Sequence, residues 1–161
     1  MTSEEQALKS AIEGLYKTFC VYPLAPKIQG CPCCVSDKDE SSLHRKPLRE
    51  LTAEDLSRYA FKSMTTWGTV GDYKHFLPRL LELVPEPAGI TCELDIEVLF
   101  GKLRYGKWDT WPEGEQRAIR HYLMALWRFA LSVPMDAYII DEYLDGIGQV
   151  EDDMSSYLDA V

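Results

Sequence analysis

The sequence predicts an all-α fold, a single-domain bundle of about six to seven helices packed around one buried central helix. Apolar residues recur at helical spacing in several segments, and no segment alternates between polar and apolar residues between hairpin turns. Residues 111–133 include a stretch that is apolar on nearly all faces, which indicates burial on all sides. At 161 residues, the chain is long enough for one domain with its own core.

Two helices and one long loop are expected in the first third of the chain. Residues 4–19 place apolar side chains at i, i+3 and i+4 spacing, which predicts a helix. Residues 20–47 are rich in proline and cysteine and lose this periodicity, so we expect a long loop. Thr52 then caps a second helix, whose first turn carries Glu54 and Asp55 where the helix dipole favours negative charge.

The remaining helices follow from the same signals. Residues 73–84 form a third apolar stripe, which Pro78 is expected to kink or to divide into two short helices. Thr91 is expected to cap a fourth helix that ends near residue 104. The central helix, 111–133, is expected to be capped by Thr110, with Glu113 completing a capping box. Residues 135–161 predict acidic C-terminal helices.

A faint internal repeat offers an alternative arrangement of the same helices. Thr52 precedes Trp67 at the head of one pair of predicted helices, and Thr91 precedes Trp108 at the head of another. Two such pairs are also consistent with HEAT-like helical hairpins stacked side by side.

Negative charge is concentrated at the C-terminal end. The net charge is −9, and residues 135–161 hold eight acidic residues and no basic one. This asymmetry argues against nucleic-acid binding, which needs a basic surface, and it suggests a basic protein as partner. The candidate partner-binding acids are Asp141, Glu142, Asp145, Glu151, Asp152 and Asp153.

The first residues of the sequence and its cysteines predict a cytoplasmic protein. The first five residues are polar and acidic, so no export signal is expected, and no apolar run is long enough to span a membrane. Five cysteines without an export signal are typical of free thiols or metal ligands in a reducing cytoplasm.

The most unusual local feature is the cysteine loop. Cys31, Cys33, Cys34 and His44 are the ligand types of a tetrahedral zinc site, although the adjacent pair, Cys33 and Cys34, is poor ligand spacing. A Cys31–Cys33 or Cys33–Cys34 disulfide, strained and therefore labile, is a second interpretation. The third is that the thiols are small packing groups.

Three aromatic residues, Tyr105, Trp108 and Trp111, lie just before the central helix. Such side chains dominate many interfaces, so they are candidates for partner binding, but they can equally seal one end of a helical bundle. No phosphate-binding loop, nucleophile elbow or zinc-protease motif occurs in the sequence, which favours a binding protein over an enzyme.

Three strings are similar to segments of bacterial proteins for which no activity is known: residues 30–35 (GCPCCV), 47–52 (PLRELT) and 75–79 (HFLPR). They lie in the first half of the chain. The resemblance implies a bacterial cytoplasmic protein and carries no implication about catalysis.

Two hypotheses from different classes follow. The first is a small helical interaction protein, for example an immunity-type or regulatory partner that masks a basic protein. The second is a zinc-binding or thiol-redox protein that uses the Cys31 to His44 loop.

Overall fold

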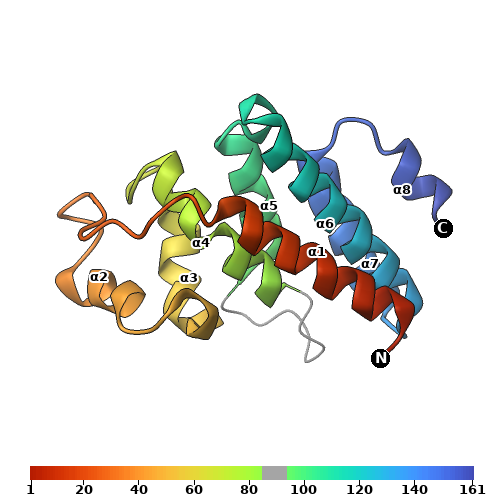
Figure 1. Cartoon of the computed structure of the whole chain (residues 1–161), viewed down its shortest axis with the longest axis horizontal. Coiled ribbons are helices and arrows are strands. Elements are labelled where there is room, and N and C mark those ends of the chain that lie inside the picture. Colours follow the sequence, from red (N-terminus) through yellow and green to blue (C-terminus); the bar gives the residue numbers. More distant parts are fainter. Residues whose placement is uncertain (85–93) are drawn as a thin grey trace. The chain divides into compact units, whose positions relative to one another are not determined.

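The computed structural model describes residues 1–84 and 94–161 and shows an all-α fold, as predicted (Figure 1). Apart from isolated bridges, these residues contain no β-structure. None of the described helices combines the length and the apolar character needed to cross a lipid bilayer. In chain order the elements are α1 (Ser3–Phe19), α2 (Asp37–His44), the 3₁₀ turn η1 (Leu48–Glu50), α3 (Ala53–Lys62), α4 (Val70–Leu83), α5 (Ile96–Tyr105), the 3₁₀ turn η2 (Trp108–Thr110), α6 (Glu113–Ser132), α7 (Ala137–Val150) and α8 (Ser155–Asp159).

The chain divides into two compact units. Unit 1 joins the two ends of the chain, Met1–Thr18 and Phe100–Val161, and unit 2 is the intervening stretch, Phe19–Leu99. The buried helix that the sequence predicts, α6, belongs to unit 1. Consecutive helices pack against one another inside each unit, α6 with α7 and α3 with α4, as in helical hairpins. The second copy of the proposed repeat begins at Thr91, which lies outside the described residues.

In unit 1, α6 has the buried character that its composition predicts. Between Tyr122 and Ala130, every side chain is buried except that of Met124, which is half-buried, and that of Arg128, which is exposed. The end of the chain closes over this helix, because the indole Nε1 of Trp127 donates a hydrogen bond to the carbonyl of Tyr157 at 2.7 Å.

The predicted start of α6 is wrong. The helix begins at Glu113 rather than at residue 111, and Thr110 does not cap it. Thr110 lies in η2, where its Oγ1 donates to the carbonyl of Lys107 at 2.7 Å. The reason is Pro112, because a residue that precedes proline is driven out of the helical region. Trp111 accordingly has extended angles, φ −73° and ψ 165°.

In unit 2, α4 is one helix that runs through Pro78, so the proline does not divide it. Proline removes one backbone hydrogen bond, and the burial of its neighbours offsets that loss. The predicted apolar stripe is confirmed, since its members are all buried: Tyr73, Phe76, Leu77, Leu80, Leu81 and Val84.

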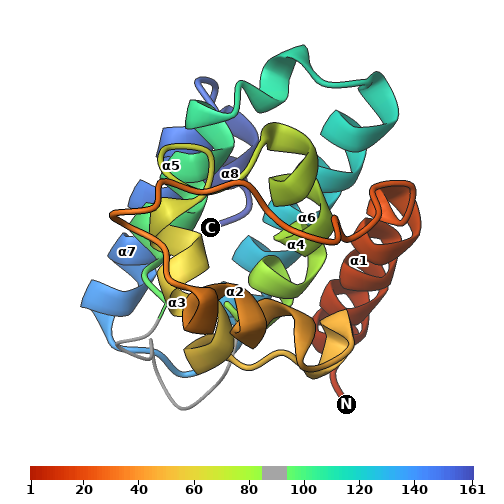
Figure 2. The ribbon, with the colours of Figure 1, turned by 90° about the vertical axis from the view of Figure 1, so that its left-hand side faces the viewer.

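The segment 20–47 is not the continuous loop that was predicted, because it contains α2, which lies beside α3 (Figure 2). Ser36 caps α2: its hydroxyl accepts the N–H of Asp39, and the Asp39 carboxylate accepts the N–H of Ser36. Leu43 is the buried residue of this short helix. Cys31, Cys33 and Cys34 precede α2 and lie in a turn.

Candidate functional site

The cysteines lie in a tight turn that runs from Cys31 to Cys34. The N–H of Cys34 and the N–H of Val35 both donate to the carbonyl of Cys31, each at 2.9 Å. Pro32 occupies the second position of this turn, where its fixed φ angle lowers the entropy lost on folding. The turn places the first and fourth residues, Cys31 and Cys34, next to each other.

Hydrogen bonds from the last residue of α3 and from the stretch that follows it anchor both ends of the turn. The N–H of Cys31 donates to the carbonyl of Thr66 at 2.8 Å, and the N–H of Gly68 donates to the carbonyl of Gln29 at 2.6 Å. At the other end of the turn, the Nζ of Lys62 donates to the carbonyl of Cys34. The cysteine turn is therefore held on the C-terminal end of α3.

Two glycines make this close approach possible. Gly30 forms an antiparallel bridge with Trp67, and a Cβ at Gly30 would lie 3.1–3.2 Å from side-chain atoms of Val35 and Trp67. Gly68 has φ +79°, in the left-handed region that glycine adopts without strain. Trp67 itself is buried, and its ring meets that of Tyr59 edge to face at 5.4 Å.

The two thiols differ electrostatically. The backbone N–H of Cys33 is directed at the Cys31 sulfur and is the largest cause that lowers the pKa of Cys31. Interaction with the side chain of Cys34 lowers that pKa further. The same contact, together with burial, raises the pKa of Cys34. Cys31 is therefore the group that ionises first, and Cys34 keeps its proton.

A cavity of about 460 Å³ opens beside the turn. The side chains that line it include Cys33 and Cys34 from the turn and Arg58, Phe61 and Lys62 from α3. Phe61 is 68% exposed, and the side chain of Arg58 is 66% exposed, so solutes can reach this wall. The described cysteines, Cys20 among them, are all free thiols.

The Cys31–Cys34 pair differs from both disulfides considered in the sequence. Cys31 and Cys34 form a Cys-x-x-Cys motif in the sequence. The sequence analysis considered only the pairs Cys31–Cys33 and Cys33–Cys34. Cys33 is exposed and contributes its backbone N–H to the Cys31 sulfur.

His44, the fourth ligand proposed for zinc, is engaged elsewhere. Its Nε2 lies 2.6 Å from the Oε1 of Glu40, one turn away on α2. Glu40 also accepts the N–H of Ile28 at 2.8 Å and the indole N–H of Trp67 at 3.1 Å, so it ties α2 to both stretches that hold the turn. Among residues 1–84 and 94–161, no three His, Cys, Asp or Glu side chains are grouped so that they could hold a metal ion.

The aromatic residues proposed as partner anchors are mostly internal. Trp108 and Trp111 are buried, and their indole N–H groups donate to the carbonyls of Val150 and Gly106 at 3.1 and 2.9 Å. Both tryptophans therefore lie inside unit 1, where their rings are not exposed to a partner. Tyr105 is exposed, and the Nζ of Lys102 lies 5.5 Å from its ring centroid.

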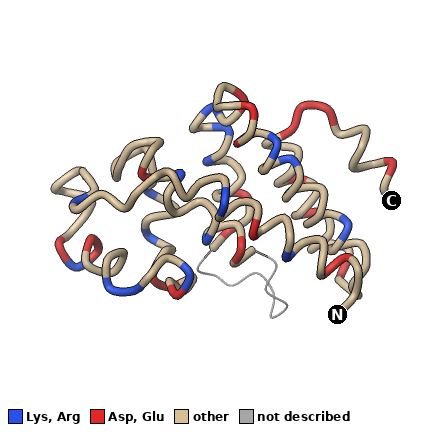
Figure 3. The backbone as a smooth tube through the Cα atoms, viewed as in Figure 1, with Lys and Arg blue, Asp and Glu red and all other residues tan. Residues whose placement is uncertain are grey.

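The acidic residues proposed for partner binding fall into two groups, and Figure 3 shows acidic positions in the stretch that leads into the last helix. Asp141, Glu142 and Asp145 are exposed on α7.

The other three, in the turn before α8, make contacts within unit 1. Glu151 lies 3.3 Å from Arg120, Asp152 lies 2.9 Å from Arg104, and Asp153 accepts the N–H of Ser155 at 3.0 Å. Asp152 and Asp153 are nevertheless exposed, so the two groups differ in their contacts within unit 1 rather than in exposure.

Comparison of the chain with protein-family models, with curated proteins and with solved structures gave no match.

Proposed function

We propose that this protein carries a thiol–disulfide exchange centre formed by Cys31 and Cys34. The supporting observation is the turn closed by the Cys34 N–H on the Cys31 carbonyl, which places the two cysteines at the first and fourth positions of one turn. A β-turn brings the Cα atoms of its first and fourth residues within about 7 Å. Disulfides join Cα atoms about 4.4–6.8 Å apart, so the pair closes with little backbone movement.

The exchange follows from the difference between the two thiols. The Cys31 thiolate attacks one sulfur of a substrate disulfide, forms a mixed disulfide and releases the other sulfur as a thiolate. Cys34 then loses its proton to solvent and attacks the Cys31 sulfur, and the second substrate thiolate leaves. One substrate disulfide is thereby reduced to two thiols while the Cys31–Cys34 disulfide forms. A small thiol regenerates the dithiol by the reverse steps.

Redox titration of the full chain tests the proposal. The protein is equilibrated with defined ratios of reduced and oxidised glutathione, free thiols are blocked, and disulfide-linked peptides are identified by mass spectrometry. We expect a two-electron transition in which Cys31 and Cys34 are joined. Cys31→Ser and Cys34→Ser each abolish it, and Cys20→Ser, at an exposed thiol outside the turn, leaves it unchanged.

Two results would contradict the exchange centre. One is a disulfide between Cys33 and Cys34, or no intramolecular disulfide over the whole range of ratios. The other is stoichiometric zinc that protects Cys31 from alkylation in protein purified without a metal-affinity tag, which would support the zinc hypothesis instead.

We propose the acidic surface of α7 as a second candidate, a docking site for a basic protein. It rests on the exposure of Asp141, Glu142 and Asp145 and on the absence of Lys and Arg after residue 134 of the sequence. Binding to a basic protein probe such as lysozyme would weaken as salt rises, because exposed charges are screened. The triple variant Asp141→Asn, Glu142→Gln, Asp145→Asn should lose binding, whereas neutralising Glu4, Glu5 and Glu13 on α1 should not.

A further inference from the structure

The wall of the cavity beside the cysteine turn is cationic and partly aromatic. Arg58 and Lys62 lie one turn apart on α3, and Phe61 lies between them in sequence. The Nζ of Lys62 reaches the carbonyl of Cys34, so one positive charge stands directly against the turn. The hydroxyl-bearing residues Thr65 and Thr66 also line the cavity.

The charge of this wall is only partly neutralised. The guanidinium of Arg58 lies 3.3 Å from the Oδ1 of Asp39, and that carboxylate also caps α2. Asp39 is largely buried, with 10% of its side chain exposed, whereas the Arg58 side chain is 66% exposed. Two cations therefore face one carboxylate whose oxygens are occupied, and the accessible side of the cavity is positive.

We infer that the substrate of the exchange centre is a small disulfide that carries carboxylates, held by Arg58 and Lys62 in the cavity while its sulfurs meet Cys31. This inference rests on the proposed function. Cys34 lines the cavity and closes the turn on Cys31 through its N–H, so a disulfide that approaches Cys31 lies at the cavity edge. Carboxylates pair with the two cations, and the ring of Phe61 covers the apolar carbons between the carboxylates and the sulfurs.

The chemistry balances with the disulfide as oxidant. One substrate disulfide and the Cys31–Cys34 dithiol become two substrate thiols and one protein disulfide. Two electrons and two protons pass from the protein to the substrate. The cations take no part in bond making and act by raising the local concentration of the anionic disulfide.

Rates with three small disulfides test the inference: oxidised glutathione, which is anionic, hydroxyethyl disulfide, which is neutral, and cystamine, which is cationic. For each disulfide, the rate at which the protein disulfide forms is divided by the rate at which the same disulfide reacts with a small neutral thiol. This ratio removes differences in the intrinsic reactivity of the three disulfides. We expect the normalised rate for oxidised glutathione to exceed that for hydroxyethyl disulfide about five-fold for each ion pair formed. Cystamine should be slowest, and the differences should shrink as salt rises.

Arg58→Gln should lower the normalised rate for oxidised glutathione several-fold and leave that for hydroxyethyl disulfide unchanged. Arg45→Gln, which removes an exposed cation that is not part of the cavity lining, is the matched control and should change neither. Equal normalised rates for the three disulfides, or equal effects of the two substitutions, would overturn the inference and leave the exchange centre standing. Failure of all three disulfides to produce a Cys31–Cys34 bond would instead remove the exchange centre itself.

Discussion

At the scale of single residues, the ionisation of Cys31 is the property on which the exchange chemistry depends. Its pKa is lowered, so the thiolate persists to a lower pH than that of an ordinary thiol. We predict that its alkylation by iodoacetamide, followed by peptide mass spectrometry, reaches half its maximal rate below pH about 8.5, the ordinary thiol value.

Cys34→Ala separates the causes of this shift. This substitution should raise the pH midpoint of Cys31 alkylation, but the midpoint should stay below the ordinary thiol value, because the N–H of Cys33, the largest cause of the lowered pKa, remains. A midpoint at the ordinary value in the parent protein would contradict the prediction.

Gly68 is a second residue whose role can be measured. At φ +79°, an alanine is strained, and its Cβ would lie 2.8 Å from the Cγ2 of the buried Ile28. Gly68→Ala should therefore lower the free energy of unfolding by about 2–3 kcal/mol, measured by urea denaturation. The same change at Gly14, where a Cβ meets nothing within 4 Å in the middle of α1, should raise it by about 1 kcal/mol. Equal effects at the two glycines would contradict this account.

Residue identity alone left the roles of the site residues ambiguous. His44 lies four positions after Glu40, so a helix over that segment pairs the two, but the segment was expected to be a loop. Because the helix α2 was not predicted, the pairing of His44 with Glu40 was not expected, and His44 was proposed as a zinc ligand. The Cys31–Cys34 contact depends on the turn at Pro32 and on its hydrogen bond to Thr66, a contact 35 positions away that no local pattern reports.

At the scale of elements, the starts of the helices show when a local rule succeeds. Within residues 1–84 and 94–161, a Ser or Thr with an acidic residue three positions later forms reciprocal hydrogen bonds at the start of four helices: Thr2 with Glu5, Ser36 with Asp39, Thr52 with Asp55, and Thr69 with Asp72. The cap at Thr52 was predicted, and the same spacing at Ser36 would have revealed α2. The pattern at Thr110 and Glu113 failed because Pro112 lies between them.

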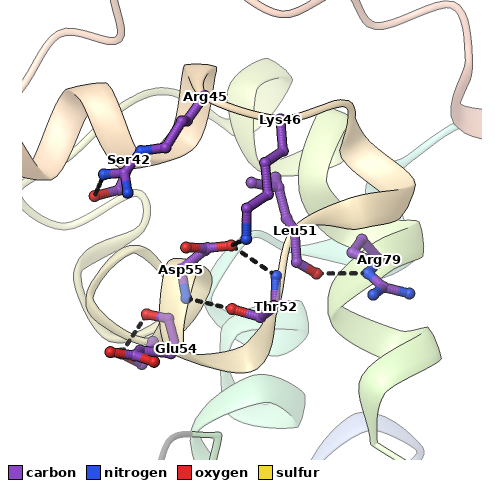
Figure 4. A network of polar contacts seen from close by, with 9 residues as sticks. Ser42, Arg45, Lys46, Leu51, Thr52, Glu54, Asp55 and Arg79 are labelled. Carbon is purple, nitrogen blue, oxygen red and sulfur yellow. Dashed lines mark hydrogen bonds and ion pairs between the residues drawn. The ribbon is translucent and has the colours of Figure 1, made fainter.

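The cap of α3 gives a prediction about pH. Burial acts to raise the pKa of Asp55, but hydrogen bonds from Lys46 and Thr52 outweigh it, and the pKa is lowered (Figure 4). The Oδ2 of Asp55 lies 2.8 Å from the Nζ of Lys46 and 2.9 Å from the N of Thr52. We expect Asp55→Asn to cost about 1–2 kcal/mol of unfolding free energy near neutral pH, measured by urea denaturation.

The sign of the pH dependence follows from the lowered pKa. The stabilisation by the Asp55 carboxylate is complete above the unfolded-state pKa of about 3.9 and disappears as the pH falls through the lower folded-state pKa. The difference between the parent and Asp55→Asn should therefore vanish in acid. Glu54→Gln, an exposed change in the same turn, should stay within about 0.5 kcal/mol at every pH. A difference for Asp55→Asn that persists in acid would assign the effect to packing rather than to charge.

At the scale of the whole molecule, periodicity predicted the long helices but neither the short helix α2 nor the grouping of the helices into units. The stripes of α1, α4 and α6 were readable because their buried residues recur locally. The division into units could not be predicted from local patterns, because unit 1 is assembled from the two ends of the chain. This pairing depends on contacts between residues about a hundred positions apart. The burial of Trp108 has the same cause: its indole N–H finds an acceptor in Val150, 42 positions later.

The C-terminal end of the chain completes the core of unit 1, and this can be tested at α8. A helix of five residues is too short to be stable alone, so α8 depends on its contacts with α6. Tyr157 is 3% exposed, and its carbonyl accepts the indole N–H of Trp127. Tyr157→Ala should lower the free energy of unfolding by about 2–4 kcal/mol and shift tryptophan emission to longer wavelength as water reaches Trp127. Leu158→Ala, next to it and 55% exposed, should cost less than about 0.5 kcal/mol. A cost for Tyr157→Ala as small as that for Leu158→Ala would mean that the burial of Tyr157 adds nothing to the stability of unit 1.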